Sequence, residues 1–130
     1  MLVLDENLPA AQRLLLRKWG IRFRAVGVEV ADSGAEDEDL IPVLHKLSRP
    51  TFFTLDRDFY RAEWVHPGHC LAWLDVRRRE AAEFIRRFLR HPEFDTRAKR
   101  MGIVARVHPG GVVYWRAKAR SPQSIPWPTQ

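Results

Sequence analysis

Short apolar runs that stop abruptly at acidic residues constrain the fold of this chain most strongly. Residues 2–4 lead directly into Asp5, and residues 51–55 lead into Asp56 and Asp58. An apolar run of this length that ends on charge is typical of a buried strand whose carboxyl end emerges at the surface. Loose alternation at 21–28 and an apolar run at 70–76 predict two further strands.

Helical patterns separate these strands. Apolar residues at positions 8, 11, 15 and 19 follow helical spacing, with Asn7 as the expected N-cap and Gly20 as the expected stop. Asp37, Glu38 and Asp39 open a second helix, where acids suit the positive end of the helix dipole. Residues 77–91 are predicted to form another helix, residues 59–64 a helical turn and residues 29–36 a loop.

The alternation of strands and helices predicts an α/β fold with a mostly parallel sheet and helices on both of its faces. Residues 103–108 and 112–118 flank a Pro-Gly-Gly turn and predict a C-terminal β-hairpin. The chain has 130 residues, which suits one domain. We expect that domain to span residues 1–120, followed by a loosely ordered Pro-rich tail at 121–130.

The same topology gathers acidic residues. Parallel strands end at one edge of a sheet, where ligands bind in such folds, so Asp5, Asp37, Asp56 and Asp58 should share one rim. Like charges in close contact raise one another's pKa, and a hard cation such as Mg²⁺ or Mn²⁺ relieves that repulsion. Acids at strand ends and helix starts are also common without a metal, so the pattern alone leaves both interpretations open.

Three segments together resemble the small PIN-like proteins of bacteria, within the PIN ribonuclease superfamily. They are Leu4-Asp5-Glu6-Asn7-Leu8-Pro9, Asp37 three residues before Leu40, and Thr54-Leu55-Asp56-Arg57-Asp58-Phe59. The resemblance covers residues 1–76 well and the hairpin loosely. It implies a three-layer α/β/α sandwich and a metal-dependent endoribonuclease, in a superfamily that includes toxins of toxin–antitoxin modules.

The resemblance also implies a catalytic metal site. Asp5, Asp37, Asp56 and Asp58 match the acids that would bind Mg²⁺ or Mn²⁺ and catalyse cleavage. Asp39 is the alternative to Asp37 as the acid of the second helix. The fourth acid, matched by Asp58, is the more variable one.

Further residues match supporting positions of the same family. Thr54 matches a hydroxyl that orients the third acid, Asp56, and Asn7 matches a polar group near Asp5. Glu6 either reaches the site or points away, because it alternates off the face that carries Asp5.

Charge is unevenly distributed along the chain, whose net charge is +6. Residues 1–60 hold 10 acidic and 8 basic side chains, and residues 61–130 hold 6 acidic and 14 basic ones. Arginine matches phosphate geometry, so we expect RNA to contact Arg79, Arg86, Arg90 and Arg116. A solvated face of ion-paired arginines, or an acidic protein partner such as an antitoxin, would produce the same pattern.

Several classes are excluded or disfavoured. No run approaches the ~18 apolar residues of a membrane span, and the first residues lack a signal-peptide pattern, so we expect a cytoplasmic protein without membrane contact. The single cysteine, Cys70, excludes an internal disulfide. Pro67 and Gly68 separate His66 from His69, which favours an ordinary turn over a metal-binding pair.

Two functions of different classes follow. The first is a Mg²⁺- or Mn²⁺-dependent endoribonuclease that could serve as the toxin of a toxin–antitoxin module. The alternative is a non-catalytic PIN-like module that binds a protein partner, RNA or a second copy of itself. A receiver-like phospho-acceptor domain also places acids after its first strand, but no convincing partner lysine follows a late strand here.

Overall fold

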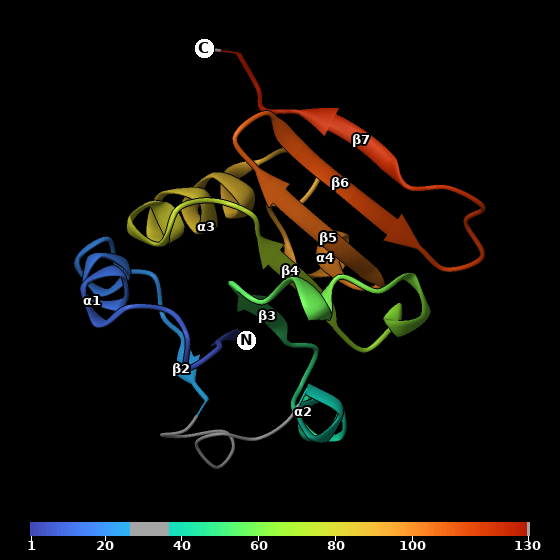
Figure 1. The fold of residues 1–130 in the computed structure, drawn as a ribbon, viewed down its shortest axis with the longest axis horizontal. Helices are drawn as coiled ribbons and strands as arrows, with labels where there is room; N and C mark the ends of the chain where they lie inside the picture. Colours follow the sequence, from blue (N-terminus) through green and yellow to red (C-terminus); the bar gives the residue numbers. More distant parts are fainter. Residues whose placement is uncertain (27–36, 130) are drawn as a thin grey trace.

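In the computed structural model, one seven-stranded sheet has helices packed against both of its faces (Figure 1). The structure describes residues 1–26 and 37–129, with the side chains of Asp37 and Glu38 left out. The expected loop at 29–36 and the last residues of the expected strand at 21–28 lie outside this part.

The sheet has the order β2-β1-β3-β4-β5-β6-β7. These strands are β1 (Leu2–Leu4), β2 (Arg24–Ala25), β3 (Thr51–Thr54), β4 (Cys70–Leu74), β5 (Ile103–His108), β6 (Gly111–Arg116) and β7 (Gln123–Pro126). The five strands β1 to β5 are parallel to one another, and β6 and β7 add antiparallel pairs at one side. The predicted mostly parallel sheet and the β5–β6 hairpin are therefore confirmed.

The helices connect the parallel strands by crossing the faces of the sheet. They are α1 (Ala10–Lys18), α2 (Asp37–His45), α3 (Ala81–Arg90) and the short α4 (Arg97–Arg100). Three single 3₁₀ turns accompany them: η1 (Arg57–Phe59), η2 (Ala62–Trp64) and η3 (Arg78–Glu80). Figure 1 shows α1 and α3 on one side of the sheet and α2 on the other, an arrangement compatible with three layers.

Alternate residues of the central strands build two separate cores. Phe53 packs with Leu16 and Phe88 on the face covered by α1 and α3. Its neighbour Phe52 packs with Leu44 on the face covered by α2. Because both faces of β3 are buried, its two phenylalanines are adjacent instead of alternating with exposed polar residues.

Helix α1 departs from its prediction in two respects. Pro9, not Asn7, is its N-cap, and no side chain caps the helix. Its fully buried residues are Gln12 and Leu16; Leu15 and Trp19 of the predicted stripe pack against the core while partly exposed, and Ala11 is exposed. Gln12 is buried because its Oε1 accepts the backbone N–H of Ala82, at 2.9 Å, in the first turn of α3. Apolar spacing alone cannot identify a buried polar contact of this kind.

The expected loose tail is wrong for residues 123–126, which form β7 against β6. The hydroxyl of Tyr114 donates to Oε1 of Gln123 at 2.5 Å, and Nε1 of Trp127 donates to the carbonyl of His108 at 2.8 Å. Pro126 is tolerated because β7 is an edge strand. In the described ranges, no helix is long and apolar enough to cross a membrane.

Candidate functional site

Two of the predicted acids follow neighbouring strands at the carboxyl edge of the parallel sheet. Asp5 comes directly after β1, and its backbone N–H donates to the carbonyl of Phe53 in β3 at 2.9 Å. Asp56 comes two residues after the end of β3. The pairing of β1 with β3 therefore sets the relative position of these two acids. We call this region the acid edge, formed by Asp5, Asp56 and Asp58.

Asp5 is a buried carboxyl group, with 7% of its surface exposed. Its Oδ1 accepts the N–H of Glu6 at 2.8 Å, and its Oδ2 accepts the hydroxyl of Thr54 at 2.6 Å. Burial raises the pKa of Asp5, and the charges of Glu6 and Asp56 raise it further, against the lowering effect of the two hydrogen bonds. The surroundings thus disfavour the charged form of Asp5.

The hydroxyl of Thr54 connects the two strand ends. Besides donating to Asp5, its oxygen accepts the backbone N–H of Asp56 at 2.9 Å and lies 3.4 Å from Nδ2 of Asn7. Asn7 also accepts the N–H of Leu55 at 3.3 Å, which explains why it does not cap α1. Thr54 was expected to orient Asp56, but its donated hydrogen bond goes to Asp5.

Asp56 and Asp58 differ in exposure. Asp56 is half-buried, and its Oδ1 accepts the N–H of Asp58 at 2.9 Å as the cap of η1. Asp58 is exposed, and its carbonyl accepts Nε of Arg61 at 2.9 Å. Within the described ranges, no lysine or arginine forms an ion pair with Asp5, Asp56 or Asp58.

Three predicted acids remain, Asp37, Asp39 and Glu6, and the structure describes the side chains of the last two. Asp37 is the first residue of α2, and its side chain lies outside the described part of the chain. Asp39 is exposed, and Glu6 is half-buried with its carbonyl accepting Arg13 at 3.2 Å. Among the side chains that the structure describes, no three carboxylates place one oxygen each within 4.8 Å of one another.

The four arginines expected to bind RNA do not form one surface. Arg79 is exposed in η3, soon after β4 leaves the edge of the sheet where the acids lie. Arg116 pairs with Ile103 at the start of β5, which places it at the opposite edge. Of the four, Arg79 is thus the one that the topology places at the acid edge.

Arg86 and Arg90 line a different feature, a cavity of about 460 Å³ between α3 and the C-terminal segment. Its lining also includes Arg87, His91 and Trp127, but none of the predicted catalytic acids. The Arg86 guanidinium lies 3.8 Å from the ring centroid of Trp19 and 2.8 Å from Oε2 of Glu83. We call this feature the α3 cavity.

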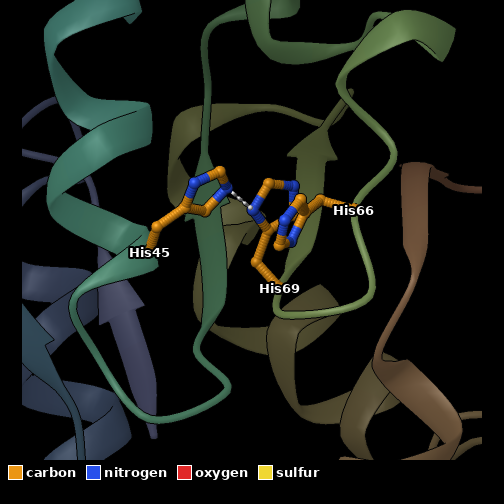
Figure 2. Close-up of side chains that lie close together, drawn as sticks. All are labelled: His45, His66 and His69. Atoms are coloured by element: carbon orange, nitrogen blue, oxygen red, sulfur yellow. Dashed lines mark hydrogen bonds between the residues drawn. The ribbon is translucent and has the colours of Figure 1, made fainter.

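Three histidines meet at the other edge of the sheet, a cluster that the sequence interpretation missed (Figure 2). His45 ends α2, while His66 and His69 belong to the turn before β4. Burial lowers the pKa of His69 to about 4, and burial and the neighbouring His66 lower the pKa of His45. The order of the elements could have revealed this cluster. Because β3 and β4 are parallel neighbours, the end of the helix before β3 and the turn before β4 lie at the same edge of the sheet.

The acid edge has the chemical character of a site for a hard cation. It offers carboxylate oxygens, one buried acid and no protein cation paired to these acids among the described residues. Oxygen donors of this kind suit Mg²⁺ and Mn²⁺. No protein-family model matches the chain, and no curated protein or solved structure matches it either.

Proposed function

We propose that the chain is a PIN-like endoribonuclease that uses Mg²⁺ or Mn²⁺ bound at the acid edge. Among the described side chains, the metal ligands are Asp5 and Asp56, with Asp58 as an outer acid, and Asp37 remains the third ligand that the sequence predicts. The observation that carries the proposal is the environment of Asp5, a buried carboxyl group beside Asp56 with no protein cation among the described residues to balance it.

The residues of the acid edge fit a hard divalent cation. Each oxygen of Asp5 accepts one hydrogen bond, from Glu6 or Thr54, so each retains a lone pair for a ligand bond. Mg²⁺ typically binds one or two carboxylates and completes its shell with waters and substrate phosphates. Asp5 and Asp56 therefore suffice as described ligands, and Asp37 at the start of α2 is a candidate third.

The chain's own residues position the reacting groups. Thr54 fixes the rotamer of Asp5, and Asn7 ties the segment after β1 to the backbone of Leu55. The N–H of Asp58 fixes one oxygen of Asp56 and leaves its other oxygen available. When bound, the metal activates water and neutralises charge that develops on the phosphodiester.

Phosphate contacts at this edge come from arginines that follow β4. Arg77, Arg78 and Arg79 are consecutive and exposed, and β4 lies next to β3 in the sheet. Exposed guanidinium groups attract a polyanion through long-range, salt-dependent electrostatics. In this proposal, these three residues hold the RNA backbone against the acid edge.

The α3 cavity favours a second candidate, a module that binds RNA or an acidic protein without cleaving it. Arg86, Arg90 and Trp127 combine phosphate-binding groups with an aromatic ring that can stack on an unpaired base. None of the predicted catalytic acids lines this cavity. Binding there, including by an antitoxin or a second copy of the chain, would not require the metal.

Cleavage of single-stranded RNA in the presence of Mn²⁺ separates the two candidates. The wild type should cleave, Asp5→Asn should lose at least about 100-fold in rate, and removal of the metal with EDTA should abolish cleavage. Asp95→Asn is the matched control, because Asp95 is an exposed acid paired with Lys99 away from the site. Equal cleavage by wild type and Asp5→Asn would reveal a contaminating nuclease, and binding without cleavage would support the second candidate.

A further inference from the structure

His45, His66 and His69 are gathered by the fold rather than by the sequence. His45 is the last residue of α2, and the other two lie 21 and 24 positions later, in the turn that enters β4. One ring nitrogen from each lies within 4.8 Å of one from each of the others. Figure 2 shows the three rings facing one another between the end of α2 and this turn.

Two of the nitrogens lie close to the separation that a metal requires. Nε2 of His45 lies 3.2 Å from Nδ1 of His69. Two imidazole ligands of a tetrahedral Zn²⁺, each about 2.0–2.1 Å from the ion, are about 3.4 Å apart. The pair shares a proton in the metal-free protein, and a small outward shift would convert it into two ligands.

His69 is prepared as a ligand by its surroundings. It is fully buried, and its Nε2 lies 2.8 Å from the carbonyl oxygen of Trp64. A carbonyl can only accept, so Nε2 carries the proton and Nδ1 presents its lone pair to His45. A backbone carbonyl that holds the outer N–H of a histidine is the usual support of metal-ligating histidines.

The other two histidines are exposed and can adjust. The rings of His45 and His66 are stacked with centroids 4.1 Å apart, so they must splay to converge on one ion. Nδ1 of His66 accepts the N–H of Gly68 at 2.9 Å, an exposed hydrogen bond. When His66 binds the metal, it gives up the hydrogen bond from Gly68 and gains a bond to the ion. His45 carries its proton on Nδ1 in that state, so that its Nε2 can bind the ion.

We propose that His45, His66 and His69 form a binding site for a zinc-class divalent cation. Imidazole nitrogen suits Zn²⁺ and its first-row neighbours far better than Mg²⁺. Three protein ligands, two of them exposed, leave a fourth position for water. The ion would join the end of α2 to the turn before β4.

This site is separate from the acid edge. His69 directly precedes the first residue of β4, which pairs with Thr51 at the start of β3, while Asp56 follows the other end of β3. A strand of four residues spans about 13 Å. The histidine site therefore goes beyond the proposed ribonuclease function and does not depend on it.

The chain supplies a matched control for this proposal. His108 begins the same His-Pro-Gly turn as His66, and its Nδ1 likewise accepts the N–H of Gly110, at 3.1 Å. Among the described residues, however, His108 belongs to no group of three histidines, cysteines or acids that could hold a metal. His108→Gln thus removes an equivalent imidazole without touching the proposed site.

Calorimetric titration of Zn²⁺ into the purified protein tests the site. We expect one tight equivalent for the wild type and for His108→Gln, and at least about tenfold weaker binding for His45→Gln and for His66→Gln. These two side chains are exposed, so circular dichroism should show unchanged folding. Absence of tight binding in the wild type, or an affinity in both His45→Gln and His66→Gln equal to that of the wild type, would overturn the proposal.

Discussion

The hydroxyl of Thr54 donates a 2.6 Å hydrogen bond to Oδ2 of Asp5 across the ends of two parallel strands. This bond stabilises the charged form of Asp5 against a burial that disfavours it. The same hydroxyl oxygen accepts the N–H of Asp56. One side chain therefore couples the first acid of the proposed metal site to the backbone of the next.

Replacing Thr54 by valine should raise the pKa of Asp5, because the donor that favours the carboxylate is lost while burial remains. Mn²⁺ affinity should fall, and the free energy of unfolding should drop by about 1–2 kcal/mol. An NMR titration of Asp5 gives the pKa. Thr51→Val removes the same hydroxyl from the other end of β3, where it accepts Nε of Arg100, and should leave the pKa of Asp5 unchanged. Equal shifts in both variants would show a general loss of packing.

Neutralising Asp56 should move the pKa of Asp5 in the opposite direction. The charge of Asp56 raises that pKa, so Asp56→Asn should lower it while still reducing RNA cleavage by about 100-fold or more. Asp58→Asn should have a smaller effect on cleavage, because Asp58 is exposed and its contact with Asp56 is made by its backbone N–H. Cleavage rates and the same NMR titration measure both effects. A larger loss in Asp58→Asn than in Asp56→Asn would contradict this ranking.

RNA affinity should depend more on the three arginines after β4 than on Arg116, which lies at the opposite edge of the sheet. The triple variant Arg77→Ala, Arg78→Ala, Arg79→Ala should weaken binding and reduce its salt dependence, whereas Arg116→Ala should change little. Binding measured across a salt series provides both quantities. Arg86→Ala and Arg90→Ala test the α3 cavity in the same assay, and dominance of these two would favour the binding module over the nuclease.

Protonation of His69 should destabilise the metal-free protein in mild acid. Its pKa is about 4 in the folded state and near 6.5 when unfolded, so the unfolded chain binds the proton more readily. The stability that depends on neutral His69 is present above pH 6.5 and is lost as the pH falls toward 4, with an upper bound of about 3–4 kcal/mol. Urea unfolding with EDTA at several pH values measures this loss. His69→Gln should flatten the dependence of the free energy of unfolding on pH between 4 and 6.5. An unchanged pH dependence in this variant would contradict the role given to His69.

Much of the fold is predictable from the sequence because apolar runs and turn residues act locally. The strands at 2–4, 51–54 and 70–74 and the hairpin around Pro109 and Gly110 follow directly from such patterns. The relation of Asp5 to Asp56 follows as well, since parallel pairing of β1 and β3 brings their carboxyl ends to one edge.

The remaining features depend on contacts between distant segments. Asparagine commonly caps helices, but the side chain of Asn7 forms hydrogen bonds with Leu55 and Thr54 in the neighbouring strand segment. β7 contains a proline and no periodic pattern, and it is held by Tyr114 and by its edge position.

The histidine cluster was missed for a similar reason. His66 and His69 alone form an ordinary turn, and their meaning changes once the end of α2 brings His45 beside them. Neither segment contains that information by itself.

Calorimetric titration of Mn²⁺ tests the central claim, a divalent-cation site built on Asp5, most directly. We predict binding to the wild type and to the double variant His45→Gln, His66→Gln, because imidazoles are not its ligands, and loss of binding in Asp5→Asn. Asp95→Asn should bind like the wild type. Unchanged Mn²⁺ binding in Asp5→Asn, or no binding to the wild type at millimolar metal, would contradict the account.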